Sequence, residues 1–346
     1  MANINIAVDC MGGDFGPSVV IPAVKKVLTE ANSPAQEKIN FQLFGQRKEI
    51  ESLLVEYKLT DSQHLAIFDS EEDVLMTDKP SVALKTKKRS SMRLALESVR
   101  DGQSHACVSA GNTGALMAIS RFILKMLPGI DRPAIISALP TYKNGQVYLL
   151  DLGANVECDE KRLAQFAIMG NELSKAIDNK KSPKVGLLNL GEEDIKGSNK
   201  LKKAAEIIEQ LEGVNYAGFI EGNQIFSGDY QVVVTDGFTG NSVLKASEGL
   251  SLFLIDRIKN AFTRNWWTKL IGLLAKPMIN ILKEEIDPER YNGASLIGLR
   301  GVVIKSHGAA NVDATAWAIE EAINQAKQKV PHQIRDSLEK AAAQLS

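Results

Sequence analysis

Residues 4–18 read INIAVDCMGGDFGPS, and this stretch contains the pattern that decides the fold. Ile4–Asp9 is an apolar, β-branched run of strand length, and the loop after it carries three glycines. The same order, a strand that leads into a glycine-containing polar loop, recurs in ACVSAGNTGA, LLDLGAN, LLNLGEE, VVVTDGFTGN and VVIKSHGAAN. Helix patterns separate most of these strands, so we predict an α/β fold with a mainly parallel sheet covered by helices on both faces.

The remaining elements follow from the same alternation. The predicted strands are Ile4–Asp9, Ile39–Phe44, Leu65–Phe68, Ala106–Ser109, Ile135–Leu139, Val147–Asp151, Lys184–Asn189, Tyr216–Ile220, Val232–Thr235 and Gly301–Ile304. The predicted helices include Ser90–Arg100, Gly114–Met126, Glu160–Asp178, Asn199–Leu211 and Asn311–Lys329. No linker or repeat divides the chain, so we expect residues 1–346 to form a single domain. Its one compositional break, Leu250–Leu282, lacks a strand signal and predicts a helical hairpin inserted at about 250–285.

Composition excludes several classes of protein. The chain of 346 residues has a formal net charge of −1, which argues against a nucleic-acid partner. No apolar run reaches the length of a membrane-spanning helix, and the start MANINIAVDC lacks the features of a signal peptide. Three widely spaced cysteines argue against a disulfide framework and favour a cytoplasmic location. Cysteine and histidine show no metal-ligand spacing, so no metal is expected.

The glycine-containing loops are the candidate ligand site. In open parallel sheets, ligands bind beyond the carboxyl ends of the strands, where glycines let backbone N–H groups approach an anion. We predict that six such loops meet at one sheet edge and bind a phosphate-sized or acyl substrate. The fingerprints G-x-G-x-x-G, G-x-x-x-x-G-K-[ST] and G-x-S-x-G are all missing, which removes the usual cradles for NAD and ATP and the common hydrolase nucleophile. No cofactor is therefore expected.

Five residues are the predicted catalytic set. Asn112 and Thr113 would cradle phosphate or the reacting carbonyl, although the same pair is equally typical of a helix cap. Lys88 would neutralise phosphate or an acidic protein, and the alternative is a solvated basic turn. Lys245 would point back to the cleft from a helix, and His307 is the only one of four histidines that lies in a candidate loop.

A wider set of loop residues is predicted to bind substrate. Asp9 and Asp14 would repel phosphate, so their expected role is to orient Lys or Asn side chains. Lys305–Gly308 forms a further candidate loop, after the predicted strand Gly301–Ile304. The full substrate-binding set is Asp9, Gly12, Gly13, Asp14, Ser109, Gly111, Gly114, Asn155, Asp236, Gly237, Gly240, Asn241 and Gly308, with Glu192, Glu193 and Lys196 as weaker candidates.

Seven segments carry a resemblance to a known family. They are VDCMGGDFGP, KPSVALKTKKRSSM, VSAGNTGALM, LDLGAN, LLNLGEEDIKG, TDGFTGN and YNGASLIGLRGVVIKSHGAAN. In order, from about Ile4 to Asn311, they look like the acyl-carrier-protein:phosphate acyltransferases (PlsX) of bacterial phospholipid synthesis. Cys10 departs from the family pattern, in which a small alanine is expected.

The resemblance implies both an activity and a setting. The implied reaction transfers a fatty acyl group from acyl-ACP to inorganic phosphate and gives acyl phosphate and ACP for phosphatidic acid synthesis. The implied fold is a three-layer, Rossmann-like α/β/α structure similar to phosphotransacetylases and to isocitrate and isopropylmalate dehydrogenases. The family also implies a homodimer that attaches peripherally to the inner face of the cytoplasmic membrane.

The residues fit this chemistry. Phosphate is a dianion near neutral pH, and a thiol with a pKa of roughly 8–9 leaves as thiolate, so acid–base catalysis is dispensable. The site must instead hold the anion and offer donors to the carbonyl oxygen. No Ser-His-Asp or Cys-His signature is present, which favours direct attack by phosphate; a covalent route through Cys10 or Cys107 is the alternative.

The predicted hairpin is basic and apolar. Between Leu250 and Lys283 stand six Lys or Arg residues and one Asp, for a net charge of +5. Adjacent tryptophans mark the expected tip, and the predicted membrane-binding residues are Phe262, Trp266, Trp267 and Leu270. Basic residues beside Trp, Phe and Leu are typical of an element that binds an anionic membrane surface. The alternative is that this apolar surface forms a dimer interface or a core helix pair.

Other functions stay open at this point. A phosphotransacetylase-like enzyme would use the same loops with a CoA thioester. A non-catalytic membrane scaffold would keep the ligand-binding sheet without turnover. A dehydrogenase is the least supported, because the dinucleotide fingerprint is missing.

Overall fold

The protein is described from a computed structural model that covers residues 3–31, 38–143, 145–191, 196–286, 288–342 and 344. Within these ranges eleven strands form one sheet in the order β3-β2-β1-β4-β11-β10-β5-β6-β9-β7-β8. The strands are β1 (Ile4–Asp9), β2 (Ile39–Gly45), β3 (Leu65–Asp69), β4 (Ala106–Ser109), β5 (Ala134–Pro140), β6 (Gln146–Leu150), β7 (Lys184–Leu188), β8 (Asn215–Ile220), β9 (Val232–Val234), β10 (Ala294–Ile297) and β11 (Val302–Lys305).

The helices connect these strands and cover them. They are α1 (Pro17–Ala31), α2 (Arg47–Glu56), α3 (Pro80–Thr86), α4 (Ser91–Arg100), α5 (Thr113–Leu124), α6 (Glu160–Asp178), α7 (Asn199–Gln210), α8 (Gly237–Thr263), α9 (Trp266–Ile286), α10 (Val312–Gln328) and α11 (Val330–Ala341), with short 3-10 helices η1 (Gly222–Ser227) and η2 (Pro288–Tyr291).

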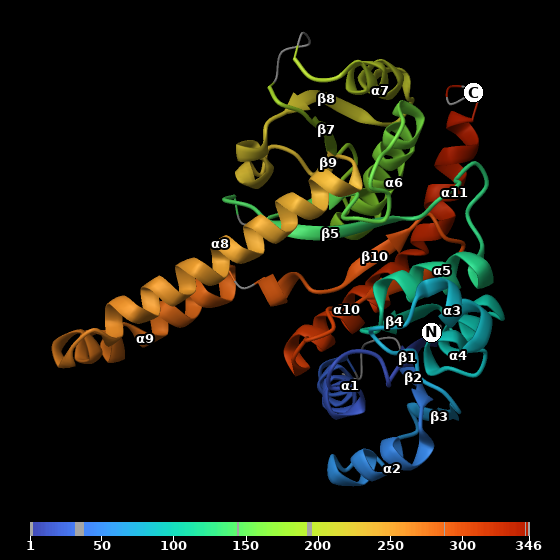
Figure 1. The fold of residues 1–346 in the computed structure, drawn as a ribbon, viewed down its shortest axis with the longest axis vertical. Coiled ribbons are helices and arrows are strands. Elements are labelled where there is room, and N and C mark those ends of the chain that lie inside the picture. Colours follow the sequence, from blue (N-terminus) through green and yellow to red (C-terminus); the bar gives the residue numbers. More distant parts are fainter. Residues whose placement is uncertain are drawn as a thin grey trace.

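Strand sense divides the sheet into two parallel blocks. β3, β2, β1, β4 and β11 are parallel to one another, and so are β6, β9, β7 and β8. Between the blocks, β10 pairs antiparallel with β11 and β5, and β5 pairs antiparallel with β6. Three successive antiparallel pairs reverse direction, so the strands of the two blocks have opposite senses. In Figure 1 β5 and β10 lie between the two halves of the body.

The core has two sides because each strand alternates its side chains between the faces of the sheet. Ile6, Val8 and Ile304 pack under α1, α2 and α10, and the same face continues as Tyr148 and Leu150 under α6, α7 and α11. On the other face lies a core against α3, α4 and α5, continued by a cluster against α8. The result is the predicted α/β/α arrangement, with α5 and α8 on the same face of the sheet.

The element predictions differ from the structure at two informative places. β10 has no counterpart among the predicted strands, because a four-residue strand after Gly293 has too little local pattern to distinguish it from a loop. The first hairpin helix begins at Gly237 and not near 250, because the helix that follows β9 continues without a break into the hairpin. By contrast, β1, β4 and α6 have the predicted bounds.

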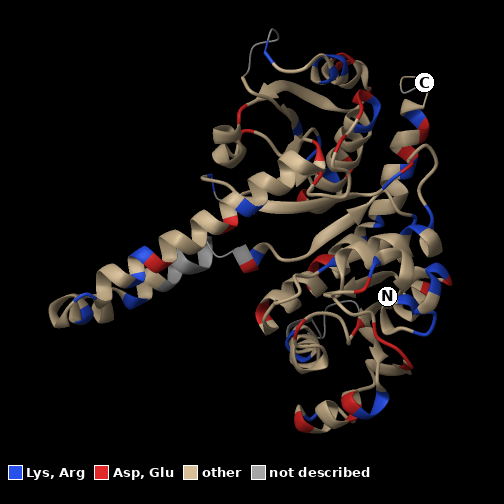
Figure 2. Cartoon of the chain, viewed as in Figure 1, with Lys and Arg blue, Asp and Glu red and all other residues tan. Residues whose placement is uncertain are grey.

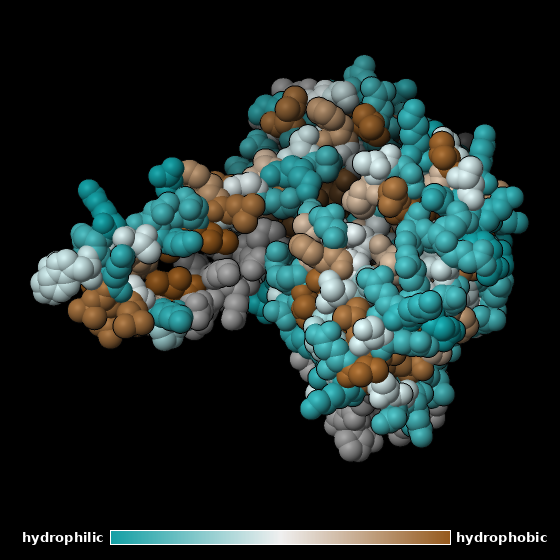
Figure 3. Space-filling model, turned by 60° about the horizontal axis from the view of Figure 1, so that its bottom comes forward, coloured by the Kyte–Doolittle hydropathy of each residue, from teal (hydrophilic) through white to brown (hydrophobic). Residues whose placement is uncertain are grey.

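Helices α8 and α9 form a hairpin that projects from the body (Figure 1). The helices approach closely at Gly272, where an added Cβ would lie 3.0 Å from the Cβ of Phe262. Lys and Arg concentrate on the outer part of the hairpin (Figure 2), and hydrophobic side chains lie along it (Figure 3). Among the described helices none is long and apolar enough to cross a membrane.

Candidate active site

Three side chains lie in register at the ends of adjacent parallel strands. Asp9 of β1 pairs with Ser109 of β4, and Ser109 pairs with Lys305 of β11. Their neighbours Ala7, Cys107 and Val303 point to the face covered by α4 and α5, so alternation directs all three side chains to that face. We call Asp9, Ser109 and Lys305 the strand-end row. All three residues are at most 9% exposed.

Asp9 is a hydrogen-bond acceptor at one end of this row. Its Oδ1 accepts from the Ser91 hydroxyl and its Oδ2 from the Ser109 hydroxyl, each at 2.6 Å. Burial raises the pKa of the Asp9 carboxyl, and these two hydrogen bonds and one from the Met11 backbone N–H oppose the rise. Asp9 therefore orients two serines, where the sequence predicted Lys or Asn.

Ser109 connects Asp9 to the loop that follows β4. Its hydroxyl donates to Asp9 and accepts from the N–H of Gly111 at 3.1 Å. The Gly111 amide was a predicted phosphate donor, yet in the structure it has a partner within the protein. Glycine is required here because the loops touch: a Cβ on Gly12 would lie 2.6 Å from the Gly111 nitrogen.

Asn112 caps a helix and holds a loop. Its Oδ1 accepts from the Ala115 N–H at 3.0 Å, which makes it the N-cap of α5. Its Nδ2 donates to the carbonyl oxygens of Met76 at 2.9 Å and Asp78 at 3.0 Å. Both polar atoms of the Asn112 amide are thus engaged, so the helix-cap alternative describes it better than the substrate cradle. Thr113 is half-buried at the first position of α5.

The loops after β1 and β11 also meet. Asp14 donates its backbone N–H to the carbonyl of Gly308 at 2.8 Å, and a Cβ on Gly13 would lie 2.9 Å from the same oxygen. His307 is exposed, and its Nδ1 accepts from the Ala309 N–H at 3.3 Å. The loops after β1, β4 and β11 therefore form one continuous site at this edge of the sheet.

Lys305 is the cation of this site. Its Nζ donates to the carbonyl oxygen of Ala110 at 3.2 Å and to that of Ser306. It forms no ion pair with any residue that the structure describes. Burial lowers the pKa of Lys305 to about 8, although the nearby carboxylates of Asp9 and Asp14 favour the charged form and Lys245 opposes it. The sequence placed Lys305 in a candidate loop without assigning it a role.

A second group of predicted residues surrounds Asp151, at the end of β6. This buried carboxylate accepts from the N–H groups of Ile135 and Asn155 at 2.9 and 2.6 Å and from the Asn155 side chain at 2.9 Å. Gly237 donates its N–H to the Asn155 carbonyl.

The other predicted residues of this group lie at the start of α8. Asp236 caps the helix by accepting from the Thr239 N–H, and Gly240 and Asn241 lie in its first turns.

The prediction that six loops share one sheet edge is wrong. β1, β4 and β11 end at one edge, whereas β6, β9 and β7 run in the opposite sense and end at the other. The helix α8 partly joins the two groups, because it carries Lys245 close enough to Lys305 for their charges to interact. Lys245 itself donates to the Glu248 carboxylate at 2.7 Å.

The other predicted residues are not part of either group. Lys88 is exposed in the turn before α4, and its side chain forms no hydrogen bond or ion pair with the described residues. Lys196 is exposed, and its carbonyl accepts from Asn189 at 3.2 Å. Glu192 and Glu193 lie outside the described residues.

The cysteines are poor nucleophiles. All three are buried and unpaired. Burial raises the pKa of the Cys10 and Cys107 thiols well above the usual range, and the Asp9 carboxylate adds to the rise; burial raises that of Cys158 to about 11. A thiol must ionise to attack a thioester, so the structure weighs against the covalent alternative.

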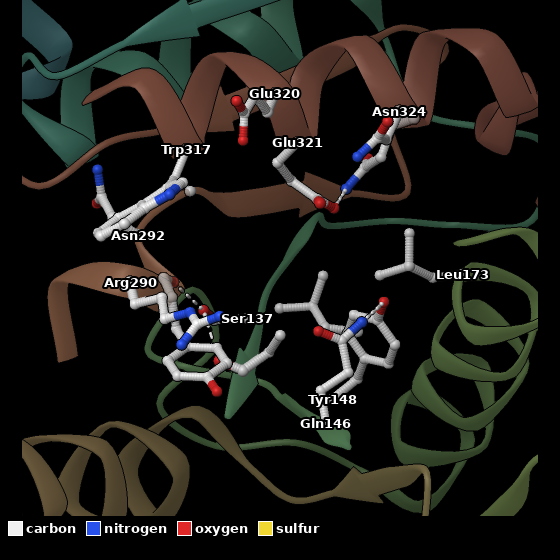
Figure 4. A pocket seen from close by; sticks show the side chains of 15 residues that line it. Ser137, Gln146, Tyr148, Leu173, Arg290, Asn292, Trp317, Glu320, Glu321 and Asn324 are labelled. Atoms are coloured by element: carbon white, nitrogen blue, oxygen red, sulfur yellow. Dashed lines mark hydrogen bonds between the residues drawn. The ribbon is translucent and has the colours of Figure 1, made fainter. Parts of the chain in front are cut away.

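A cavity of about 300 Å³ lies on the opposite face of the sheet, between α6 and α10. In Figure 4, α10 places Trp317, Glu320 and Glu321 along one side of it, and Arg290 lies across from them. Burial raises the pKa of the Glu321 carboxyl, which accepts from the Gln325 side chain at 2.6 Å. Glu320 and Glu321 outnumber Arg290 among the charged side chains that line this cavity, whereas the strand-end row presents a buried ammonium at Lys305, so the row is the better anion site. The described residues contain no group of side chains that could hold a metal ion.

Comparison with solved structures defines the class of fold. The chain is similar to a phosphotransacetylase from Streptococcus pyogenes, with a TM-score of 0.65 and 17% identity, covering 94% of each chain. It is also similar to a branched-chain phosphotransacylase from Enterococcus faecalis V583, with a TM-score of 0.57 and 13% identity, covering 93% of this chain and 99% of the other. At these identities the likeness establishes the fold alone.

Sequence comparison then gives the family. The model of the family described as "Fatty acid synthesis protein" matches residues 4–333. Proteins named "Phosphate acyltransferase" are 49% identical over 334 residues in Coxiella burnetii (strain CbuG_Q212), 96% of each chain, and 46% identical over 339 residues in Shewanella sediminis, 98% of each chain. The chain belongs to this fatty acid synthesis protein family.

Proposed function

We propose that this protein is an acyltransferase that moves an acyl group from a thioester to inorganic phosphate and releases acyl phosphate and a thiol. The observation that carries the proposal is the 49% identity, along 96% of the chain, to proteins named phosphate acyltransferase. The strand-end row supports it, because a buried ammonium and closely packed loops are suited to an anionic nucleophile.

Direct attack by phosphate is the mechanism that the site supports. The phosphate oxygen would form the new bond to the acyl carbon while the bond from that carbon to sulfur breaks and the thiolate leaves with the electron pair. The buried thiols with raised pKa values favour this route over an acyl-cysteine. The protein's part is to position the dianion and to stabilise the negative charge that develops on the carbonyl oxygen.

The decisive experiment feeds the purified protein acyl-ACP with and without phosphate. We expect phosphate-dependent loss of acyl-ACP and the appearance of acyl phosphate, detected as the transfer of radiolabelled phosphate into an acylated product. Replacement of phosphate by sulfate is the control and should give no product. Hydrolysis of acyl-ACP to free fatty acid regardless of phosphate, or no turnover at all, would contradict the proposal.

The acyl donor is the finer part of this proposal. We take acyl-ACP as the donor and phospholipid synthesis as the destination, on the strength of the family resemblance. Parallel assays with acyl-ACP and acyl-CoA separate this reading from a phosphotransacetylase that uses a CoA thioester. A kcat/KM at least tenfold higher for acyl-CoA would favour the CoA enzyme.

We also propose a domain organisation, an oligomeric state and a membrane contact for the enzyme. The whole chain would form one α/β domain, since a single sheet passes through both halves, and two chains would form a cytoplasmic homodimer. The hairpin would dock on an anionic membrane: Trp266 and Trp267 are 64% and 59% exposed and stack on each other, and Leu270 is exposed beside them. Phe262 is half-buried against Gly272, so its role is to hold the two helices together.

The membrane proposal is tested with the double variant Trp266→Ser, Trp267→Ser. We expect it to lose co-sedimentation with anionic vesicles while its turnover in a detergent-free soluble assay stays within twofold of wild type. The matched control Tyr142→Ser removes an aromatic ring that is 82% exposed elsewhere on the body and should leave vesicle binding unchanged. Undiminished vesicle binding by the double variant would contradict a lipid-facing hairpin tip.

A further inference from the structure

The strand-end row contains a charge that the protein does not neutralise by contact. The Lys305 ammonium has three N–H donors, and the structure gives it two acceptors, both of them neutral backbone carbonyls. A buried charge is costly unless an opposite charge or several hydrogen bonds compensate for it. Asp9 and Asp14 act on Lys305 without an ion-pair contact, and the Asp9 oxygens accept hydrogen bonds from Ser91 and Ser109.

A second cation acts on Lys305 from another element, and its own ammonium donates to the Glu248 carboxylate at 2.7 Å. Lys245 extends from the third turn of α8, and its charge is close enough to that of Lys305 to disfavour the ionised form. The positive charge of Lys245 therefore disfavours a second positive charge on Lys305. An anion between them would replace this repulsion by two attractions.

The backbone amides are less available than the sequence suggested. The Gly111 N–H donates to Ser109, the Ala115 N–H donates to Asn112, and the Asp14 N–H donates to Gly308. These three amides are therefore engaged within the protein, whereas the Lys305 ammonium has one N–H donor with no acceptor among the described residues.

We propose that the Lys305 ammonium binds the inorganic phosphate that attacks the thioester, with Lys245 on the opposite side of the anion. This inference rests on the proposed function, which it deepens by assigning the phosphate ligand. Asp9 and Ser109 are then positioning residues: Ser109 holds the Ala110–Gly111 turn, whose carbonyl at Ala110 fixes the Lys305 side chain.

The test compares Lys305→Met and Lys305→Arg with wild type, and Lys203→Met serves as a matched control because Lys203 is exposed on α7. In Lys305→Met we expect the KM for phosphate to rise roughly 10- to 100-fold, the factor for a lost hydrogen bond between charged groups, while the KM for acyl-ACP stays within threefold. Lys305→Arg keeps the charge and should lie between wild type and Lys305→Met. Lys203→Met should match wild type.

The pH profile is a second readout that a purely structural role would not change. Phosphate is already mostly dianionic at about pH 8 and changes little above it, so wild-type kcat/KM for phosphate should fall above about pH 8 as free Lys305 loses its proton. Lys305→Arg should not show this fall. If Lys305→Met does not fold, this comparison decides alone. The assignment would be overturned if kcat/KM for phosphate fell equally above about pH 8 in wild type and in Lys305→Arg. It would also be overturned if folded Lys305→Met had a KM for phosphate within twofold of wild type.

Phosphate binding without turnover separates this inference from the proposed function. Phosphate should raise the melting temperature of wild type and of Lys203→Met, but not that of Lys305→Met, whether or not acyl-ACP is a substrate. Binding that depends on Lys305 in a protein that makes no acyl phosphate would sustain the site and reject the reaction. Acyl phosphate synthesis with a stabilising effect of phosphate that is independent of Lys305 would do the reverse.

Discussion

Replacement of Asn112 by alanine should destabilise the protein because the side chain does two jobs. Loss of the N-cap of α5 costs about 1 kcal/mol. Loss of the hydrogen bonds from Nδ2 to the carbonyls of Met76 and Asp78 costs about 1 kcal/mol each. We therefore expect Asn112→Ala to lower the free energy of unfolding by about 3 kcal/mol, measured by urea denaturation.

Two further variants separate the jobs. Asn112→Asp keeps an oxygen for the cap but removes both donors, so it should lose about 2 kcal/mol. Ser198→Ala removes only the cap of α7 and should lose about 1 kcal/mol. The reasoning is refuted if Asn112→Ala loses no more than Ser198→Ala, because the loop at Met76 would then not depend on Asn112. A fall in activity at unchanged stability would instead restore Asn112 to the substrate cradle.

Three more outcomes are expected. Gly12→Ala places a methyl group 2.6 Å from the Gly111 nitrogen, so the loops must separate. We expect the variant to lose about 1–3 kcal/mol of unfolding free energy and most of its activity. The control Gly222→Ala, with no atom within 4 Å of its new Cβ, should change neither quantity. Cys10→Ala should keep turnover within threefold, and intact-mass measurements during turnover should detect no acylated protein; an acyl adduct that vanishes in this variant would establish a covalent route. Burial lowers the pKa of Lys305 from 10.5 to about 8, so the folded state binds fewer protons than the unfolded state between these values and gains stability as pH rises from about 8 to 10.5. The unfolding free energy of wild type relative to Lys305→Met, measured by urea denaturation at pH 7, 9 and 10.5, should therefore rise with pH. A difference that does not change with pH would contradict the lowered pKa of Lys305.

The sequence was a reliable guide wherever a signal was local. β1 was recognisable from Ile4–Asp9 because a run of six residues, four of them apolar, leads into a glycine turn. α6 was recognisable from a 19-residue helical pattern that begins after Asp159. The loop after β1 was recognisable as a candidate site because of its glycines and carboxylates. The sequence did not decide the chemistry of the loop after β4, since Asn112 is equally suited to cap a helix and to bind an anion.

Strand direction was the feature that local patterns could not reveal. β5 and β10 carry no sign of being antiparallel, and only their pairing reverses the second half of the sheet. As a result, Asp236 and Asn155 end near Asp151 and not beside Asp9. The charge of Lys245 nevertheless acts on Lys305 from α8, which packs through Val243 and Leu244 on the same face of the sheet.

The amino-acid sequence by itself determined the α/β class, the strand–loop–helix units and the family, because each depends on residues that are neighbours along the chain. Only the tertiary structure decided which loops share a site and which groups are free to bind. Hydrogen bonds between residues 82 and 100 positions apart, from Ser91 and Ser109 to Asp9, occupy the acceptors of that carboxylate. They leave Lys305 as a buried cation with no contacting counter-charge among the described residues, and the register of three parallel strands, which no local pattern encodes, put it there.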